Sequence, residues 1–223
     1  MGLWQVCAVG IFHSGFVDYG VGNLFSLRSS LDAIGADAMV TGDPEAIRYA
    51  DKIILPGVGA FGDAAAKLRE NGLDQVVIEE AKSGKPLMGI CLGMQLLFDT
   101  GEEYGVHEGL GLIPGRVVSM KGVVPEEYKI PHIGWNGLIF PEGRGGKNAA
   151  EKSPIFKYIE NGDCVYFVHS FFAADCKESV IADTEYGALL TAAVQKDNVY
   201  GCQFHPEKSG NVGLNILKAF CEL

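Results

Sequence analysis

The residues best suited to chemistry lie at positions 86–97, where an apolar run leads into Gly89-Ile-Cys91-Leu-Gly93 and then into a helical pattern. The arrangement Gly-x-Cys-x-Gly is typical of a nucleophile elbow, in which glycines leave room for a strained turn between a strand and a helix. Such a turn would place Cys91 above the sheet edge and near a helix N-terminus, where the helix dipole favours the thiolate. Although a cysteine is most often a small core residue, the flanking glycines favour a nucleophile here.

A cysteine nucleophile needs a base, and the base needs a carboxylate that orients it. His205 and Glu207 offer such a pair, because they flank Pro206 at the end of an apparent strand. Proline stiffens the turn, so both side chains could project from one strand end over the elbow. A His-x-Glu pattern alone is typical of many surface turns, but together with the elbow it predicts a Cys91–His205–Glu207 triad.

The segment 53–62 reads as a strand followed by a glycine-rich turn, and its Gly-x-Gly-x-x-Gly superficially matches the dinucleotide-binding fingerprint. A nucleotide site is disfavoured because Pro56 opens the turn and no acidic residue ends a following strand at the expected distance. An oxyanion hole explains the turn better. Backbone N–H groups of Val58 and Gly59 could join that of Leu92 in stabilising a tetrahedral oxyanion.

The other histidines are less informative. His169 ends an apolar run and could line a pocket, although a structural histidine is at least as plausible, and His132 lies in a turn-rich segment that could equally be surface. No set of His, Asp and Glu residues has metal-ligand spacing, so we expect no metal and no other cofactor.

Composition narrows the class of protein. The 223 residues carry 18 Lys and Arg against 28 Asp and Glu, a formal net charge of −10, which argues against nucleic acid or an anionic membrane as partner. The sequence contains neither a long apolar run nor the pattern of a signal peptide. Reduced thiols in the cytoplasm are the default expectation for six cysteines without a CxxC pair, which stand at positions 7, 91, 164, 176, 202 and 221.

Strand and helix patterns alternate in the first half of the chain, which predicts an α/β fold with a parallel sheet and right-handed crossovers. After about residue 109 short apolar segments separated by glycine and proline favour antiparallel hairpins, so the whole sheet should be mixed. Strands are predicted at 15–18, 52–55, 86–91, 117–120, 135–140, 165–169, 180–184, 189–195 and 199–204, and helices at 23–34, 63–71, 73–83, 93–98 and 211–222. The segment 141–150 is the one flexible loop candidate.

Five motifs in consistent order, spanning about residue 15 to the C-terminus, resemble the class I (triad) glutamine amidotransferases. More narrowly, they are similar to the glutaminase subunits of imidazole glycerol phosphate synthase, of histidine biosynthesis. The motifs are Asp18-Tyr-Gly-Val-Gly-Asn23, Leu55-Pro-Gly-Val-Gly-Ala-Phe-Gly62, Pro131-His-Ile-Gly-Trp-Asn136, Tyr166-Phe-Val-His-Ser170 and Gln203-Phe-His-Pro-Glu-Lys-Ser209, beside the elbow at Cys91.

The resemblance implies a flavodoxin-like domain over 14–223, with a central mixed, mostly parallel sheet flanked by helices and with residues 1–13 as an extension of unclear role. It implies that glutamine is hydrolysed to glutamate and ammonia through a γ-glutamyl thioester on Cys91. His205 would transfer the proton, and Glu207 would orient the His205 imidazole. Residues implied to hold glutamine are Gly59, Gln95, His169, Ser170 and Phe171.

The resemblance further implies a heterodimer with a (βα)₈-barrel cyclase, which would use the ammonia to make imidazole glycerol phosphate and an aminoimidazole carboxamide ribotide. Asn23, Trp135, Tyr166 and Lys208 match positions that face this cyclase. We also hypothesise that the segment 58–59 rests without a proper oxyanion hole until cyclase ligand shifts its population.

Two departures from the family pattern stand out: the segment 1–13 precedes the expected first strand, and Phe171 replaces a common tyrosine. The nearest alternative is the glutaminase of pyridoxal phosphate synthase, although that family typically carries Gly-Gly-Glu-Ser where this chain has Pro56-Gly-Val-Gly59. A non-catalytic binding domain would be expected to lose a triad residue. A cysteine peptidase would leave Gln95 and Trp135 without a purpose.

Overall fold

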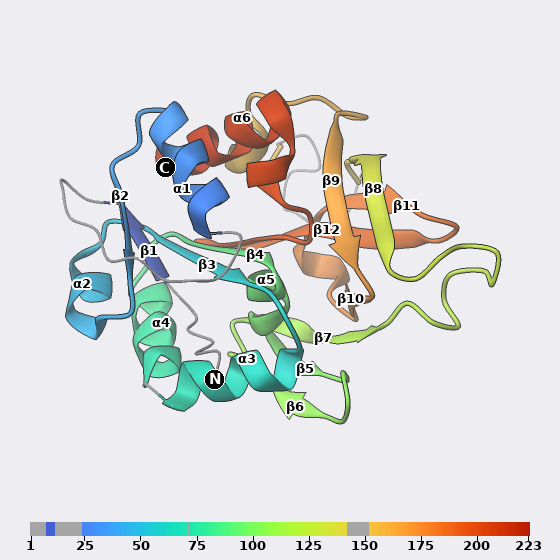
Figure 1. The fold of residues 1–223 in the computed structure, drawn as a ribbon, viewed down its shortest axis with the longest axis horizontal. Coiled ribbons are helices and arrows are strands. Elements are labelled where there is room, and N and C mark those ends of the chain that lie inside the picture. Colours follow the sequence, from blue (N-terminus) through green and yellow to red (C-terminus); the bar gives the residue numbers. More distant parts are fainter. Residues whose placement is uncertain (1–7, 12–23, 71, 142–151) are drawn as a thin grey trace.

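The computed structural model describes residues 8–11, 24–70, 72–141 and 152–223, and its centre is a seven-stranded sheet. Helices cover both faces of this sheet (Figure 1), as the sequence predicted for an α/β fold. In spatial order the strands are β11 (Val180–Glu185), β12 (Leu189–Lys196), β13 (Val199–Cys202), β4 (Leu87–Cys91), β3 (Ile53–Gly57), β1 (Ala8–Ile11) and β2 (Ala38–Thr41).

Parallel pairing is confined to the middle of the described sheet, where β4 lies between β3 and β13. Gly57 pairs with Cys91 and Cys202 pairs with Ile90, so all three strands end at the same edge. Polar groups that follow these strands therefore meet at one edge of the sheet, which is where open α/β sheets usually place a site.

The sheet is mixed, as predicted, but the expectation that it is mostly parallel is wrong. Four of the six adjacent pairs among the described strands are antiparallel. Short connections join β11 to β12 and β12 to β13, and a connection of two or three residues can only reverse the chain. On the other side, β1 runs antiparallel to both of its neighbours.

Two hydrophobic clusters hold helices against the sheet. Side chains of β3 alternate between them, because successive residues of a strand point to opposite faces: Ile53 and Leu55 join one cluster and Ile54 the other. Packed against the Ile54 face are α1 (Leu24–Ala33) and α6 (Gly210–Cys221), while α3 (Phe61–Glu70) and α4 (Leu73–Lys82) cover the opposite face. These four helices agree with the predicted ranges to within two residues, apart from Asn71, which lies outside the described residues.

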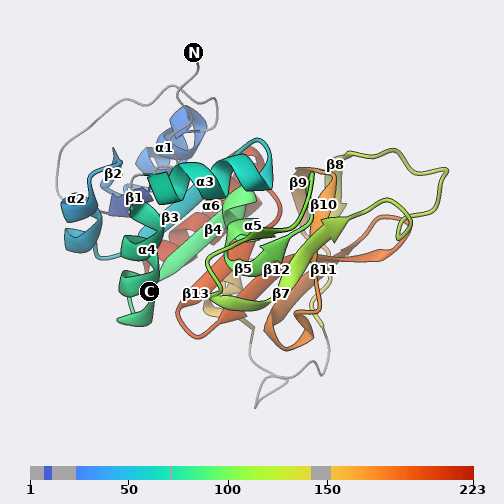
Figure 2. The same ribbon diagram turned by 90° about the horizontal axis from the view of Figure 1, so that it is seen from below.

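Two smaller sheets lie toward the end of the molecule opposite to β2 and α2 (Pro44–Tyr49), as Figures 1 and 2 show. One has the order β10 (Phe171–Ala174), β7 (Ile113–Ser119), β5 (Phe98–Gly101), β6 (His107–Glu108), and the other pairs β8 (His132–Gly137) with β9 (Cys164–His169). The sequence did not predict β2, β5, β6, β10 or α2. The expected helix at 93–98 is shorter, because α5 (Leu92–Leu96) ends before Phe98 enters β5.

The N-terminal part departs from the prediction in another way. The expected strand at 15–18 lies outside the described residues, as does the loop at 142–150. Within the segment expected to precede the first strand, residues 8–11 form β1 of the central sheet. Within the described residues, no helix combines the length and apolar character needed to cross a membrane.

Candidate active site

The turn between β4 and α5 has the backbone of a nucleophile elbow. Cys91 adopts φ 53° and ψ −112°, a conformation that is strained for a residue with a side chain. The glycines on either side allow close packing: a Cβ at Gly93 would lie 1.7 Å from the Leu55 carbonyl oxygen, and one at Gly89 2.6 Å from that of Gly93. The turn therefore presents the Cys91 side chain at the sheet edge, where β3 and β13 also end.

His205 and Glu207 follow β13 and lie beside this turn. His205 Nδ1 and Glu207 Oε1 are 2.8 Å apart, and both side chains are almost completely buried. Burial by itself lowers the pKa of His205, but hydrogen bonding to Cys91 and Glu207, with their charges, outweighs it and raises the pKa to about 9. At neutral pH the geometry thus favours an imidazolium held between a carboxylate and the Cys91 sulfur.

His205 is held in place through its backbone as well. The N–H of His205 donates to the Tyr166 carbonyl on β9 at 2.9 Å. Ser209 Oγ donates to the His205 carbonyl at 2.7 Å and accepts from the Tyr166 N–H at 3.0 Å. These three hydrogen bonds tie the segment 205–209 to β9, although β9 belongs to a different sheet.

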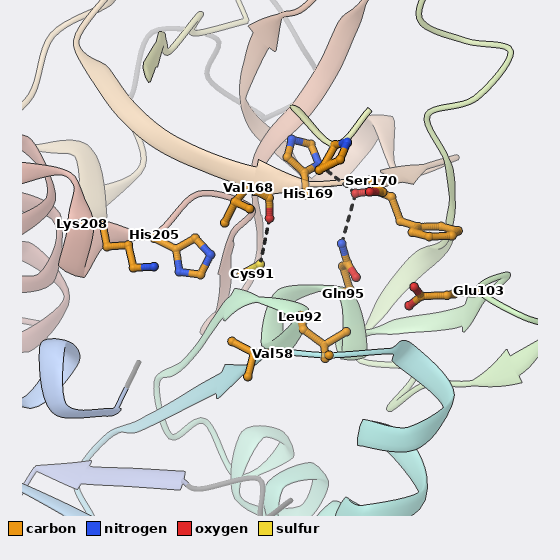
Figure 3. Close-up of a pocket in the computed structure, with 13 residues that line it drawn as sticks. Val58, Cys91, Leu92, Gln95, Glu103, Val168, His169, Ser170, His205 and Lys208 are labelled. Carbon is orange, nitrogen blue, oxygen red and sulfur yellow. Dashed lines mark hydrogen bonds between the residues drawn. The ribbon is translucent and has the colours of Figure 1, made fainter. Parts of the chain in front are cut away.

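A cavity of about 550 Å³ opens over Cys91 (Figure 3). In that view His205 and Lys208 lie on one side of Cys91, whereas Gln95 and Glu103 lie on the other. Its lining includes every residue that the sequence assigned to the oxyanion hole or to glutamine binding, together with the predicted nucleophile and base: Val58, Gly59, Cys91, Leu92, Gln95, His169, Ser170, Phe171 and His205. The fold thus gathers residues that are up to 147 positions apart.

The far wall of the cavity is held by hydrogen bonds to one carbonyl group. Phe171 O accepts from Gln95 Nε2 at 3.2 Å and from His169 Nδ1 at 2.9 Å. Burial lowers the pKa of His169 to about 4, so the ring is neutral at pH 7 and keeps a lone pair on Nε2. His169 therefore has a structural role and also lines the pocket, two interpretations that the sequence left open.

His132 is a support for this wall and lies inside the protein, not at the surface. It is fully buried, stacks on Phe167 and Tyr186, and places Nδ1 3.1 Å from His169 Nε2. Burial lowers the pKa of His132, while a hydrogen bond to Asn136 opposes that shift.

Glu103 is a pocket residue that the sequence analysis did not find. Half-buried, it follows β5 and accepts a hydrogen bond from the Phe61 N–H at the start of α3 at 2.9 Å. Because β5 is only four residues long and has no clear periodicity, nothing in the sequence placed this carboxylate near Cys91.

The residues expected to face a partner cluster at the cavity rim. Trp135 is 55% exposed, and its ring meets that of Tyr166 edge-on with centroids 6.0 Å apart. Lys208 Nζ lies 5.8 Å from the Tyr166 ring centroid and also lines the cavity. Asn23 lies outside the described residues. In the part of the chain that the structure describes, no group of three or more His, Cys, Asp or Glu could hold a metal ion.

Comparison with known proteins agrees with this geometry. Residues 16–222 match the family model of class I glutamine amidotransferases. Subunit HisH of imidazole glycerol phosphate synthase from Wolinella succinogenes is 47% identical over 94% of this chain and 98% of its own length. The corresponding subunit from Geobacillus sp. is 46% identical over 94% and 96%. The chain belongs to the HisH family.

Solved structures support the fold of this HisH chain. A crystal structure of a glutamine amidotransferase superposes with a TM-score of 0.67 at 19% identity, over 91% of this chain and 95% of its own. PurLQS from Thermotoga maritima gives 0.65 at 19% identity, over 93% and 95%. The HisH relatives favour the synthase of histidine biosynthesis over the pyridoxal phosphate synthase alternative.

Proposed function

We propose that this HisH chain hydrolyses glutamine at the cavity over Cys91 and delivers ammonia to a cyclase. The observation that carries the mechanism is the imidazole of His205, held between Glu207 and the sulfur of a cysteine on a strained strand-to-helix turn. A thiolate beside an imidazolium is an activated nucleophile with a proton donor at hand. Class membership supports the reaction, and these contacts support the roles that we propose for Cys91, His205 and Glu207.

In the first half-reaction the Cys91 thiolate attacks the side-chain amide carbon of glutamine. N–H groups of Val58, Gly59 and Leu92 stabilise the tetrahedral oxyanion. The imidazolium of His205 gives its proton to the departing nitrogen, the C–N bond breaks, and ammonia leaves a γ-glutamyl thioester on Cys91.

In the second half-reaction neutral His205 takes a proton from water as its oxygen attacks the thioester. The C–S bond breaks, the electron pair returns to Cys91, and glutamate leaves. Glu207 keeps the imidazole oriented in both steps and stabilises its charged form.

Substrate recognition follows from the pocket's polar groups. The carboxylate of Glu103, which lies across the cavity from His205, suits the α-ammonium group of glutamine. Gln95 and the backbone of His169, Ser170 and Phe171 form the wall that would hold the side-chain amide.

The partner in this proposal is a (βα)₈-barrel cyclase, bound as a heterodimer in the cytoplasm. Lys208 lines the cavity and lies over the ring of the half-buried Tyr166, which in turn contacts the exposed ring of Trp135. Ammonia released at Cys91 could therefore pass directly to a partner that binds at these residues. The partner would convert a phosphoribulosyl carboxamide nucleotide to imidazole glycerol phosphate and an aminoimidazole carboxamide ribotide. No cofactor, nucleic acid or membrane enters this scheme.

The deciding experiment measures glutamate release by the chain alone, with cyclase, and with cyclase plus its nucleotide ligand. We expect strong activity in the full complex and little in the free chain, because the turn at 58–59 is exposed to solvent and a partner could change its conformation. Cys91→Ala should abolish activity in every condition. Activity that survives in Cys91→Ala would overturn the proposed nucleophile, and equal rates with and without the partner would overturn its control of the oxyanion turn.

A further inference from the structure

Gln203 is a buried amide beside the nucleophile to which the proposed mechanism gives no role. It is the first residue after β13 and is completely buried. Its Nε2 lies 3.9 Å from Cys91 Sγ and its Oε1 lies 3.1 Å from Gln95 Nε2. Both ends of the amide are therefore engaged within the site.

The orientation of this amide is set by its neighbours. Phe171 O is a backbone carbonyl and can only accept, so the group of Gln95 that faces it must be the NH₂. The second N–H of the same group then points at Gln203, which must present its oxygen to Gln95. Gln203 is left with its NH₂ directed at the Cys91 sulfur.

A hydrogen-bond donor at this position would stabilise negative charge on the Cys91 sulfur. The Val168 carbonyl oxygen lies 4.0 Å from Cys91 Sγ, and its negative end opposes charge on the sulfur. Helix α5 has only five residues, so its dipole offers limited compensation. An N–H donated to an anionic acceptor is among the stronger hydrogen bonds in proteins.

We propose that Gln203 is a catalytic residue whose side-chain N–H donates to the Cys91 thiolate. It stabilises the anion that attacks glutamine and stabilises the same anion again when the C–S bond of the thioester breaks. The inference rests on Cys91 being the nucleophile, as proposed above.

The ionisation of Cys91 also depends on the other charged or titratable groups around the cavity. His205 faces the sulfur, His169 lies on the opposite wall, and Glu103 and Lys208 also line the cavity. The pH midpoint of Cys91 reactivity will therefore belong to the Cys91–His205 pair, and substitutions at Gln203 test one contribution to that midpoint.

The test is the rate of Cys91 alkylation by iodoacetamide as a function of pH, followed by peptide mass spectrometry in the chain bound to its cyclase. Gln203→Met keeps a similar volume without a donor or a charge. We expect its alkylation midpoint to rise by about one pH unit, which lowers the rate about tenfold below the midpoint. Gln203→Glu places an acceptor against the sulfur and should raise the midpoint further.

Gln195→Glu provides the matched control, because Gln195 lies on β12, is not among the residues that line the cavity, and donates its side-chain N–H to the Asp197 carbonyl. It should leave the profile unchanged. If Gln203→Met lowers the melting temperature but alkylates Cys91 with the wild-type profile, Gln203 is structural and the proposal is overturned. Failure of the proposed function looks different, since wild-type Cys91 would then be unreactive or Cys91→Ala would remain active.

Discussion

The floor and the rim of the active-site cavity are built in contrasting ways. On the floor, Gln203 is fully buried, and Gln95 and His205 are at most 5% exposed, each with hydrogen bonds to its neighbours. At the rim, Val58 is 37% exposed and Trp135 55%. The chain alone therefore fixes the proposed nucleophile and base, whereas the rim presents apolar surface that a partner can cover.

This difference follows from which strands support each part. The floor residues lie at or after the ends of β4 and β13, which are parallel strands in the middle of the central sheet. The rim is formed by the turn after β3 and by the two-stranded pair of β8 and β9, one face of which is exposed to solvent. If the reacting groups lie on the buried floor and the partner contacts the exposed rim, the partner could regulate the reaction without changing the positions of the triad residues.

Removal of the carboxylate on the floor should have the largest effect. In Glu207→Gln the amide cannot stabilise the His205 imidazolium, so we expect kcat to fall about a thousandfold while KM changes little. Glutamate release by the complex measures this. Glu222→Gln, a change at an exposed carboxylate on the far end of α6, is the control and should keep wild-type kcat. A loss below tenfold in Glu207→Gln would show that the buried pair is not the core of the mechanism.

A change in the oxyanion turn should have the next largest effect. Gly59 has φ +104°, which a residue with a Cβ adopts only with strain. Gly59→Ala should displace the turn and lower kcat about a hundredfold, because one oxyanion donor is worth that much. Gly42→Ala is the matched control, since nothing lies within 4 Å of its added Cβ. An unchanged kcat in Gly59→Ala would show that the turn at 58–59 does not supply an oxyanion donor.

The floor was also the easier part to predict. The turn at Cys91 could be recognised from the local sequence, because only small residues at positions 89 and 93 allow the close backbone approach seen there. The parallel strands β3 and β4 and the four long helices likewise have strong local patterns. By contrast, Gln203 contacts Cys91 across 112 positions, so its environment exists only after folding.

The parts that sequence reasoning missed depend on distant pairing. Glu103 follows a four-residue strand without periodicity, and the burial of His132 comes from rings on β9 and on the turn after β11. Parallel and antiparallel pairing on the flanks of the sheet is decided by connection length and by neighbours, not by the composition of each strand. That is why a mixed, mostly parallel sheet was predicted, whereas most adjacent pairs among the described strands are antiparallel.

Glu103 tests whether the cavity wall opposite His205 selects the substrate's charge. Glu103→Gln keeps an oxygen for the Phe61 N–H but removes the carboxylate, so we expect KM for glutamine to rise about tenfold with kcat nearly unchanged. Its neighbour Glu102→Gln, which loses only an exposed ion pair to Arg116, should keep the wild-type KM. Steady-state kinetics in the complex distinguish the two, and a Glu103→Gln variant that loses kcat instead would assign this carboxylate to the chemistry.

The rim makes a prediction about the partner. Trp135→Ala removes an exposed ring that packs against Tyr166, and we expect the Kd for the cyclase to rise about tenfold or more. Titration calorimetry measures this directly. Tyr49→Ala removes an even more exposed aromatic ring at the end of α2, at the other end of the molecule, and should not affect binding. Equal losses in both variants would mean that the rim is not the interface.

The smallest effect concerns stability, and it checks whether the floor is charged before any partner or substrate binds. A folded-state pKa of about 9 for His205, above the unfolded value near 6.5, stabilises the fold fully below pH 6.5, and this contribution is lost as the pH rises through 9. Between pH 6.5 and pH 9.5 the melting temperature of the free wild-type chain should therefore fall a few degrees more than that of His205→Asn, measured by differential scanning calorimetry. Parallel curves of melting temperature against pH for the two proteins would mean that His205 is neutral in the free chain. The partner would then have to create the His205–Glu207 ion pair, and the floor, like the rim, would depend on the partner for its active form.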